Sequence, residues 1–196
     1  MTVNRYLDAR GIRITTGTIV DATIIHAPSS TKNSNGERDP DMHQTRKGKD
    51  WHFGMKAHVG TDRHGIVHSL STTAANVSDI TQMPELLHGE EREVFGDQAY
   101  WSEAHRQAAL AKGIRYRVNR RSPHLSEHQR FINRRRSAAR ARVEHVFHVV
   151  KRLWGFNKVR YRGLAKNTAR LFTAFALANL YLVRRRLMAP GEQCLC

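Results

Sequence analysis

The chain has 196 residues, of which 33 are Lys or Arg and 17 are Asp or Glu, so its formal net charge is +16. This length favours one domain, and the excess of positive charge favours a polyanionic partner such as nucleic acid. The two cysteines, Cys194 and Cys196, form no disulfide framework and indicate a reducing cytoplasm, and the longest apolar run, residues 171–183, is too short to span a bilayer.

The first half of the chain is predicted to form three strands around one long loop. Residues 16–25 are rich in β-branched side chains and are predicted to be a buried strand. Residues 29–50 are polar and are predicted to be a loop. Residues 51–61 and 65–73 are expected to form a hairpin around a turn at residues 62–65. One face of the first hairpin strand is apolar, and the other carries His52, Lys56 and His58.

Helices and strands then alternate. Helices are predicted at residues 78–87 and 102–111, and short strands at 93–96 and 114–118. A capping box at Ser126 and Gln129 begins a long helix that ends near Trp154, and a final helix covers residues 167–186. This order predicts an α/β fold in which a mixed five-stranded sheet is flanked by helices.

Glu144 stands out within the most basic part of the chain. Residues 115–170 hold seventeen Lys and Arg but only two acidic residues, whereas residues 1–114 are close to neutral. On the predicted helix, Arg140, Glu144 and Lys151 share one side, next to an apolar stripe. A single carboxylate in such a position indicates a metal ligand beside a phosphate-binding surface. A helix salt bridge from Glu144 to Arg140 or His148 is the alternative.

Two aspartates occupy strand positions that are unusual for a carboxylate. Asp21 lies inside the first predicted strand, where an ionised group is costly unless it is paired or bound to a metal. Asp97 follows the strand 93–96, at the carboxyl end where ligands gather in α/β sheets. Each aspartate has an ordinary structural alternative, a backbone-bonded strand end for Asp21 and a turn for Asp97.

Taken together, these acids resemble those of the DDE transposases of bacterial insertion sequences, nearest to the group of insertion sequence five. The last acid of that group lies in a Tyr-x2-Arg-x3-Glu-x6-Lys signature, which here reads Arg140-x3-Glu144-x6-Lys151 with Ser137 in the place of Tyr. Residues 18–23 and 96–100 resemble the segments of the first and second Asp, and residues 54–58 and 73–79 resemble further blocks. The resemblance covers about residues 16–187 and implies a ribonuclease-H-like fold.

The resemblance implies that Asp21, Asp97 and Glu144 are the catalytic residues and hold Mg²⁺, for which Mn²⁺ can substitute. Cleavage of a phosphodiester needs a nucleophile activated on one face of phosphorus and a stabilised leaving oxygen on the other, and two such ions do both. Three carboxylates suffice because Mg²⁺ prefers oxygen ligands and retains waters. The implied reaction is cleavage and strand transfer at the ends of an insertion sequence.

Several cations are predicted to contact DNA phosphates and to give affinity without sequence choice. They are Arg134, Arg135, Arg136, Arg140, Lys151, Lys56, Arg160 and Arg162. A solvated charged face is the alternative for the Arg run and for the connector, and a solvated hairpin face is the alternative for the strand that carries Lys56.

The expected organisation is a short N-terminal remnant (1–15), a catalytic core (16–154, including the loop 29–50), a basic connector with a C-terminal helix (155–188), and a tail (189–196). Relatives carry a further N-terminal helical region, so the chain is expected to be a truncated transposase. The expected partners are double-stranded DNA at transposon ends and target, and a homodimer or an assembly with full-length transposase. We expect no membrane partner and a bacterial, nucleoid-associated, cytoplasmic location. The alternatives are a non-catalytic DNA-binding remnant and a ribonuclease-H-like nuclease without strand transfer.

Overall fold

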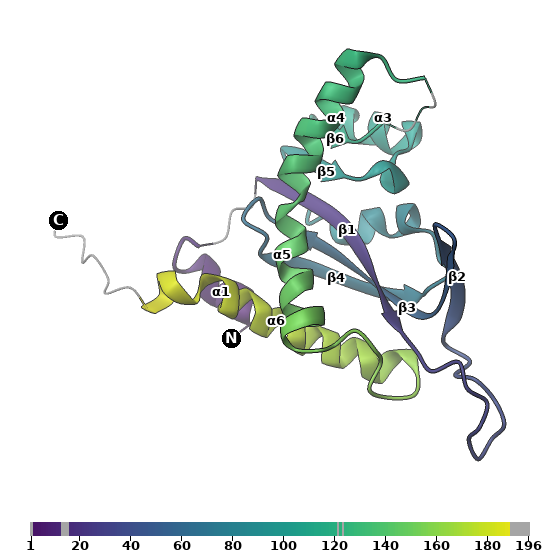
Figure 1. The fold of residues 1–196 in the computed structure, drawn as a ribbon. Coiled ribbons are helices and arrows are strands. Elements are labelled where there is room, and N and C mark those ends of the chain that lie inside the picture. The colour runs from purple at the N-terminus through teal and green to yellow at the C-terminus, as the bar shows by residue number, and fades with distance from the viewer. Residues whose placement is uncertain (1, 13–15, 121, 123, 189–196) are drawn as a thin grey trace.

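The structure is a computed structural model that describes residues 2–12, 16–120, 122 and 124–188. The predicted tail 189–196, with both cysteines, lies outside the described residues. Figure 1 shows a twisted sheet with one long helix across a face and a second long helix near its lower edge. No helix in the described ranges is long and apolar enough to cross a membrane.

The sheet is mixed and has six strands: β1 (Gly17–His26), β2 (His43–Lys47), β3 (Asp50–Thr61), β4 (Val67–Ala74), β5 (Glu93–Gly96) and β6 (Arg115–Val118). The strand order is β2-β3-β1-β5-β6, and β4 also pairs with β3. The pairs of β3 with β1, β2 and β4 are antiparallel, whereas β5 is parallel to both β1 and β6. The chain therefore forms hairpins first and parallel crossovers afterwards.

The predicted α/β fold with a mixed sheet flanked by helices is confirmed, and the sheet has six strands where five were expected. The five predicted strands are all present. The prediction of a loop throughout residues 29–50 is wrong, since β2 lies within it. Because β2 is polar and mostly exposed, it lacks the alternating apolar pattern that marks a half-buried strand. Its backbone is satisfied instead by a tight hairpin in which Lys47 pairs with Asp50.

Helices cover both faces of the sheet. The short N-terminal helix α1 spans Val3–Asp8, and the predicted helix at 78–87 is split into a 3₁₀ turn, η1 (Asp79–Gln82), and α2 (Met83–Leu86). A second 3₁₀ turn, η2 (Gln98–Tyr100), precedes α3 (Glu103–Ala111), which is capped by the hydroxyl of Ser102. The final helix α6 covers Leu164–Met188.

The long helix predicted to begin at Ser126 is present but is not uniform. The capping box of Ser126 and Gln129 opens α4 (Glu127–Arg140), and α5 (Arg142–His148) follows after a break at Ala141. A π-helical turn, η3 (Val149–Leu153), completes the helix. The chain leaves it at Gly155, whose φ of 65° is the left-handed conformation that commonly ends a helix.

The sheet separates two hydrophobic cores. The larger core packs β1 and β3 against α5, η3 and α6, and includes Met55, Val59, Val146, Phe147 and Phe175. The smaller core packs the other face of β1, β5 and β6 against α2 and the segment around η2, as shown by its members Val20, Leu86, Val94, Tyr100 and Val118. Both faces of β1 are therefore buried, one in each core. A third cluster packs α1 on α6 through Leu7 and Val183.

Candidate active site

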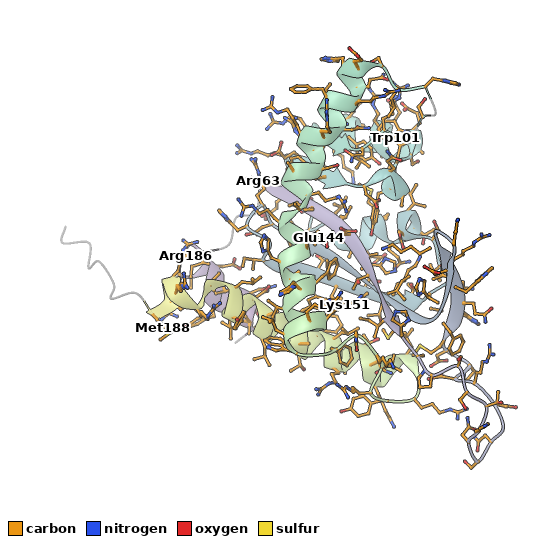
Figure 2. The ribbon with its side chains drawn as sticks, in the orientation of Figure 1. Arg63, Trp101, Glu144, Lys151, Arg186 and Met188 are labelled. Atoms are coloured by element: carbon orange, nitrogen blue, oxygen red, sulfur yellow. The ribbon has the colours of Figure 1, made fainter. Side chains whose placement is uncertain are left out.

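A cleft of about 1040 Å³ follows β1 on one side and the helix α5–η3 on the other. Its lining includes all three acids proposed from the sequence, Asp21, Asp97 and Glu144, and both cations of the proposed signature, Arg140 and Lys151. In Figure 2, Glu144 and Lys151 lie on the helix that crosses the face of β1. The structure therefore brings the five residues of the proposed signature to one cleft.

Asp21 is the most buried of the three acids, with 7% of its surface exposed. Its Oδ2 accepts a hydrogen bond from Nη1 of Arg140 at 2.7 Å, and its Oδ1 accepts one from the backbone N–H of Ala22 at 2.8 Å. Burial raises the pKa of Asp21 to about 6, Arg140 opposes that rise, and the carboxylates of Asp97 and Glu144 add to it. The three negative charges are thus close enough to act on one another.

Asp97 is placed by the end of a short strand. β5 runs parallel to β1 with Ile19 opposite Phe95, and continuing this register by two residues brings Asp97 level with Asp21. Adjacent strands lie about 4.8 Å apart, so the two aspartates are neighbours at the same end of the sheet. The carboxylate of Asp97 caps η2 by accepting the N–H of Ala99 at 2.8 Å, and its side chain is half-buried.

Glu144 reaches the cleft from the helix above β1. The buried residues Val143, Val146 and Phe147 hold α5 on the sheet and leave Glu144 exposed on the cleft side. The alternative of a salt bridge to Arg140 is wrong, because Arg140 pairs with Asp21 instead. Among the described residues Glu144 forms no ion pair at all, so its carboxylate is available to a ligand.

The chemistry of these donors fits a hard divalent cation, because carboxylate oxygens are the ligands that Mg²⁺ prefers. Their spacing does not form a finished metal centre. Within the described part of the chain, no three His, Cys, Asp or Glu side chains converge closely enough to hold a metal ion. At Asp21 the positive charge is supplied by Arg140, whose guanidinium neutralises the buried carboxylate.

Lys151 ties the far end of the helix to β1. Its Nζ donates hydrogen bonds to Oγ1 of Thr23 at 2.9 Å and to the carbonyl of Ile24 at 3.0 Å. Burial lowers the pKa of Lys151, and the neighbouring cations Lys47 and Arg152 lower it further. Lys151 therefore holds the helix on the strand as well as facing the cleft.

One residue at the acidic end of the cleft was not recognised as a site residue from the sequence. Asp79 was expected only as part of the helix predicted at residues 78–87, yet it lines the cleft and pairs with Lys56 at 2.8 Å. Lys56 also donates to the carbonyl of Val77 at 2.7 Å, so this predicted DNA contact is engaged inside the protein. No pattern in the sequence joins Asp79 to Lys56, since β4 separates them and only the fold brings them together.

His58 lies behind this ion pair and is fully buried. Its Nε2 lies 2.9 Å from the hydroxyl of Thr73. Burial lowers the pKa of His58 to about 4; Asp79 partly offsets this effect, and Lys56 adds to it. The ring is therefore neutral at neutral pH. The interpretation of this strand face as a solvated hairpin surface is wrong, because Asp79 of η1 pairs with Lys56 on this face and lies 3.8 Å from the buried ring of His58.

The remaining predicted DNA contacts lie outside the cleft lining. Arg134 and Arg135 are exposed on α4, and Arg160 and Arg162 are exposed in the connector between η3 and α6. Arg136 is half-buried, and its Nη1 donates to the carbonyl of Val118 at 2.8 Å, so it supports β6. Ser137, at the Tyr position of the proposed signature, accepts a hydrogen bond from Asn119 at 2.9 Å.

Asp21 and Asp97 lie side by side on two parallel strands, and Glu144 reaches the same cleft from the helix above them. This arrangement defines the chain as an α/β domain with a three-carboxylate cleft. Comparison with known families agrees with this class. Residues 13–180 match the family described as the transposase DDE domain, so the chain belongs to this family.

A similar solved structure is the cryo-EM structure of the simian T-cell lymphotropic virus intasome in complex with the PP2A regulatory subunit B56 gamma. The match has 14% sequence identity and a TM-score of 0.36, and it covers 93% of this chain and 52% of that chain. The present chain thus spans about half the length of the matched one.

Proposed function

We propose that the chain is the catalytic core of a DNA transposase of the insertion sequence five group, which cleaves phosphodiester bonds and transfers strands at the ends of an insertion sequence. The observation that supports this most strongly is the meeting of Asp21, Asp97 and Glu144 in one cleft of a DDE-family chain. The Arg-x3-Glu-x6-Lys spacing supports the assignment to the group, because Arg140 and Lys151 face the same cleft as Glu144.

In this proposal Asp21, Asp97 and Glu144 would hold Mg²⁺, or Mn²⁺ in its place. Such ions, when bound, activate the attacking oxygen and stabilise the leaving oxygen. The protein itself supplies position and charge. Arg140 keeps Asp21 ionised within its buried strand and lies where it can contact a phosphate beside it. Lys151 holds the helix of Glu144 against β1.

The DNA would be gripped by basic side chains around this core. Arg134 and Arg135 on α4, and Arg160 and Arg162 in the connector, are exposed and free to contact phosphates. We propose residues 16–154 as the catalytic core and 155–188 as a basic connector and packing helix. The proposed partners are transposon-end and target DNA, together with a second copy or a full-length transposase, in the bacterial cytoplasm.

The proposal is tested by plasmid nicking. The purified chain should nick supercoiled DNA with Mg²⁺ or Mn²⁺ and not with EDTA, and Asp97→Asn should abolish nicking while DNA binding persists. Removal of this acid takes away a proposed ligand and no phosphate contact. Glu103→Gln, at an exposed site on α3, is the matched control and should nick as the parent does. Equal nicking by Asp97→Asn and the parent would show that the cleft is not the catalytic site.

A non-catalytic DNA-binding protein that modulates an intact transposase is the second candidate. It is favoured by the ion pair of Asp21 with Arg140 and by the open spacing of the acids in the described residues. Calorimetric titration with Mn²⁺ separates the two functions, because only the enzyme needs a cation site that Asp97→Asn weakens. A strand-transfer assay with a pre-cut oligonucleotide separates a transposase from a ribonuclease-H-like nuclease.

A further inference from the structure

The cleft has a second end, which is basic. Beyond the acids, its lining continues to His26 on β1, to Arg46 and Lys47 on β2, and to Lys151 and Arg152 in η3. Only Lys151 among these residues belongs to the transposase signature. Because the segment of β2 was expected to be a loop, Arg46 and Lys47 could not be placed beside the helix of Glu144 before the structure was known.

The cations at this end lie close to one another. Burial lowers the pKa of Lys151, and Lys47 and Arg152 lower it further by charge repulsion. Burial likewise lowers the pKa of His26, with additional effects from His52, Lys151 and Lys158. Among the described residues, Arg46, Lys47 and Arg152 form no ion pair with an acid. Glu144 acts on Lys151 in the opposite direction, but the three unpaired cations leave this end of the cleft positively charged, and such a surface attracts polyanions.

The positions of these cations are set by two tight backbone features. The β2–β3 hairpin closes at Lys47 and Asp50, and Gly48 adopts a φ of 64° in its turn. Nε of Arg46 donates to the carbonyl of Gly48 at 3.1 Å, which orients that side chain at the hairpin tip. Across the cleft, the π-helical turn carries Lys151 and Arg152. Regular backbone structure therefore fixes the cations on both sides of the basic end.

The length of the cleft can be measured along each wall. On β1, the five residues from Asp21 to His26 correspond to about 17 Å at the usual rise of a strand. On the helix, the twelve residues from Arg140 to Arg152 correspond to about 18 Å. The two lengths agree. Because one strand of DNA advances about 3.4 Å per nucleotide, the cleft spans about five nucleotides.

The width of the cleft favours a single strand. A volume of about 1040 Å³ over about 17 Å corresponds to a width on the order of 10 Å. A duplex is wider than this, since its major groove alone is about 12 Å wide, so one strand fits between the two walls better than an intact duplex does. The occupant that fits the shape and the charge is the backbone of one strand.

We propose that Arg46 and Lys47 of the β2–β3 hairpin, together with Lys151 and Arg152 of η3, form a second phosphate-binding site that holds a single DNA strand about five nucleotides from the phosphodiester at the acidic end. This inference rests on the proposed function. The strand would then be held at two points, one at the acids and one at the hairpin, so the distance between them sets the length of DNA bound in the cleft.

The test is binding of fluorescent oligothymidylates, followed by anisotropy in EDTA so that no cleavage occurs. The variant is Arg46→Gln with Lys47→Gln. The matched control, Arg92→Gln with Lys112→Gln, removes the same charge from exposed sites outside the cleft lining. The log–log salt slope of the hairpin variant should fall by about 1.4, because each phosphate contact to a single strand contributes about 0.7. The control should keep the parent slope.

Strand length gives an independent readout. The parent should gain affinity as the oligonucleotide grows to about six nucleotides and then level off, because a longer strand reaches both ends of the cleft. The hairpin variant should lose that gain. An equal slope in the hairpin variant and the parent, or an equal loss in the hairpin variant and the control, would overturn the proposal.

These outcomes are separate from those of the nicking assay. If nicking depends on Asp97 while the hairpin variant binds single strands as the parent does, only the second phosphate site is refuted. If the hairpin effect is found but nicking never occurs, the basic end binds DNA and the catalytic proposal fails. Both variants should melt at the temperature of the parent, since Arg46 and Lys47 are exposed on an edge hairpin.

Discussion

The buried Asp21 carboxyl should make the free energy of unfolding depend on pH in a direction opposite to the usual one for an acid. Its pKa of about 6 in the folded chain lies above its ordinary value of 3.8. A group with a raised folded pKa stabilises the protein fully below pH 3.8, and this stabilisation is lost as the pH rises through about 6. The difference between the two values corresponds to roughly 3 kcal/mol.

His58 should act in the opposite sense over the same range. Its pKa of about 4 lies below its ordinary value of 6.5, so its stabilisation is present above pH 6.5 and is lost as the pH falls through about 4. This also amounts to roughly 3 kcal/mol. The contributions of these two groups therefore oppose one another between about pH 4 and about pH 6 in the unsubstituted chain.

Single substitutions should reveal the separate contributions of Asp21 and His58 to the free energy of unfolding. Relative to the parent, Asp21→Asn should gain roughly 3 kcal/mol as the pH rises from about 3.5 to about 7, and His58→Gln should gain a similar amount as the pH falls. The measurement is urea unfolding in EDTA, followed by circular dichroism at a series of pH values. Asp50→Asn, at an exposed hairpin position, is the matched control for the loss of a carboxylate.

The difference between Asp21→Asn and the parent isolates the titration of Asp21, because all other groups are common to both proteins. A difference that stays constant from about pH 3.5 to about pH 7 would refute the reasoning, since it would mean that Asp21 titrates alike in the folded and unfolded chains. A difference of the opposite sign would mean that Arg140 outweighs burial.

Four further predictions concern binding and stability. Replacing Arg134 and Arg135 by Ala should lower the log–log salt slope of duplex binding by about 1.8, at about 0.9 per contact, as read from anisotropy titrations. Arg136→Ala should leave that slope unchanged and cost about 1–3 kcal/mol in urea unfolding, because a buried carbonyl of β6 loses its donor. Lys151→Met should cost a similar amount in the same assay by removing two hydrogen bonds to β1. Gly54→Ala should lower the melting temperature strongly, because its Cβ would lie 2.1 Å from a backbone oxygen of β1.

The features that could be predicted from the sequence were those with a local physical signature. The strand of Asp21 was visible because its β-branched residues are buried on both faces. The hairpin turn was visible in Asp62 and Gly65: the Asp62 side chain accepts two backbone N–H groups, and Gly65 takes a φ of 85°. The capping box at Ser126 gave the start of the long helix.

The features that escaped prediction depend on contacts between distant segments. β2 is stabilised by pairing with β3 and not by an apolar face of its own. The π-helical turn depends on backbone bonds that no residue type specifies. Asp79 reaches the cleft wall, with His58 buried behind it, only because β3, β4 and η1 meet. In each case the favourable energy comes from tertiary packing, which local propensity does not contain.

Arg140 and Lys151, the two cations of the proposed signature, also restrain the helix that carries Glu144. Glu144 lies four residues after Arg140 and seven before Lys151, and both cations are bonded to β1. Glu144 therefore lies on a helix segment that is hydrogen-bonded to β1 on both sides, and β1 also carries Asp21. Any motion that separates Glu144 from Asp21 must first break one of these hydrogen bonds. The spacing of Arg140, Glu144 and Lys151 therefore lets both cations hold the helix against β1, which preorganises the cleft.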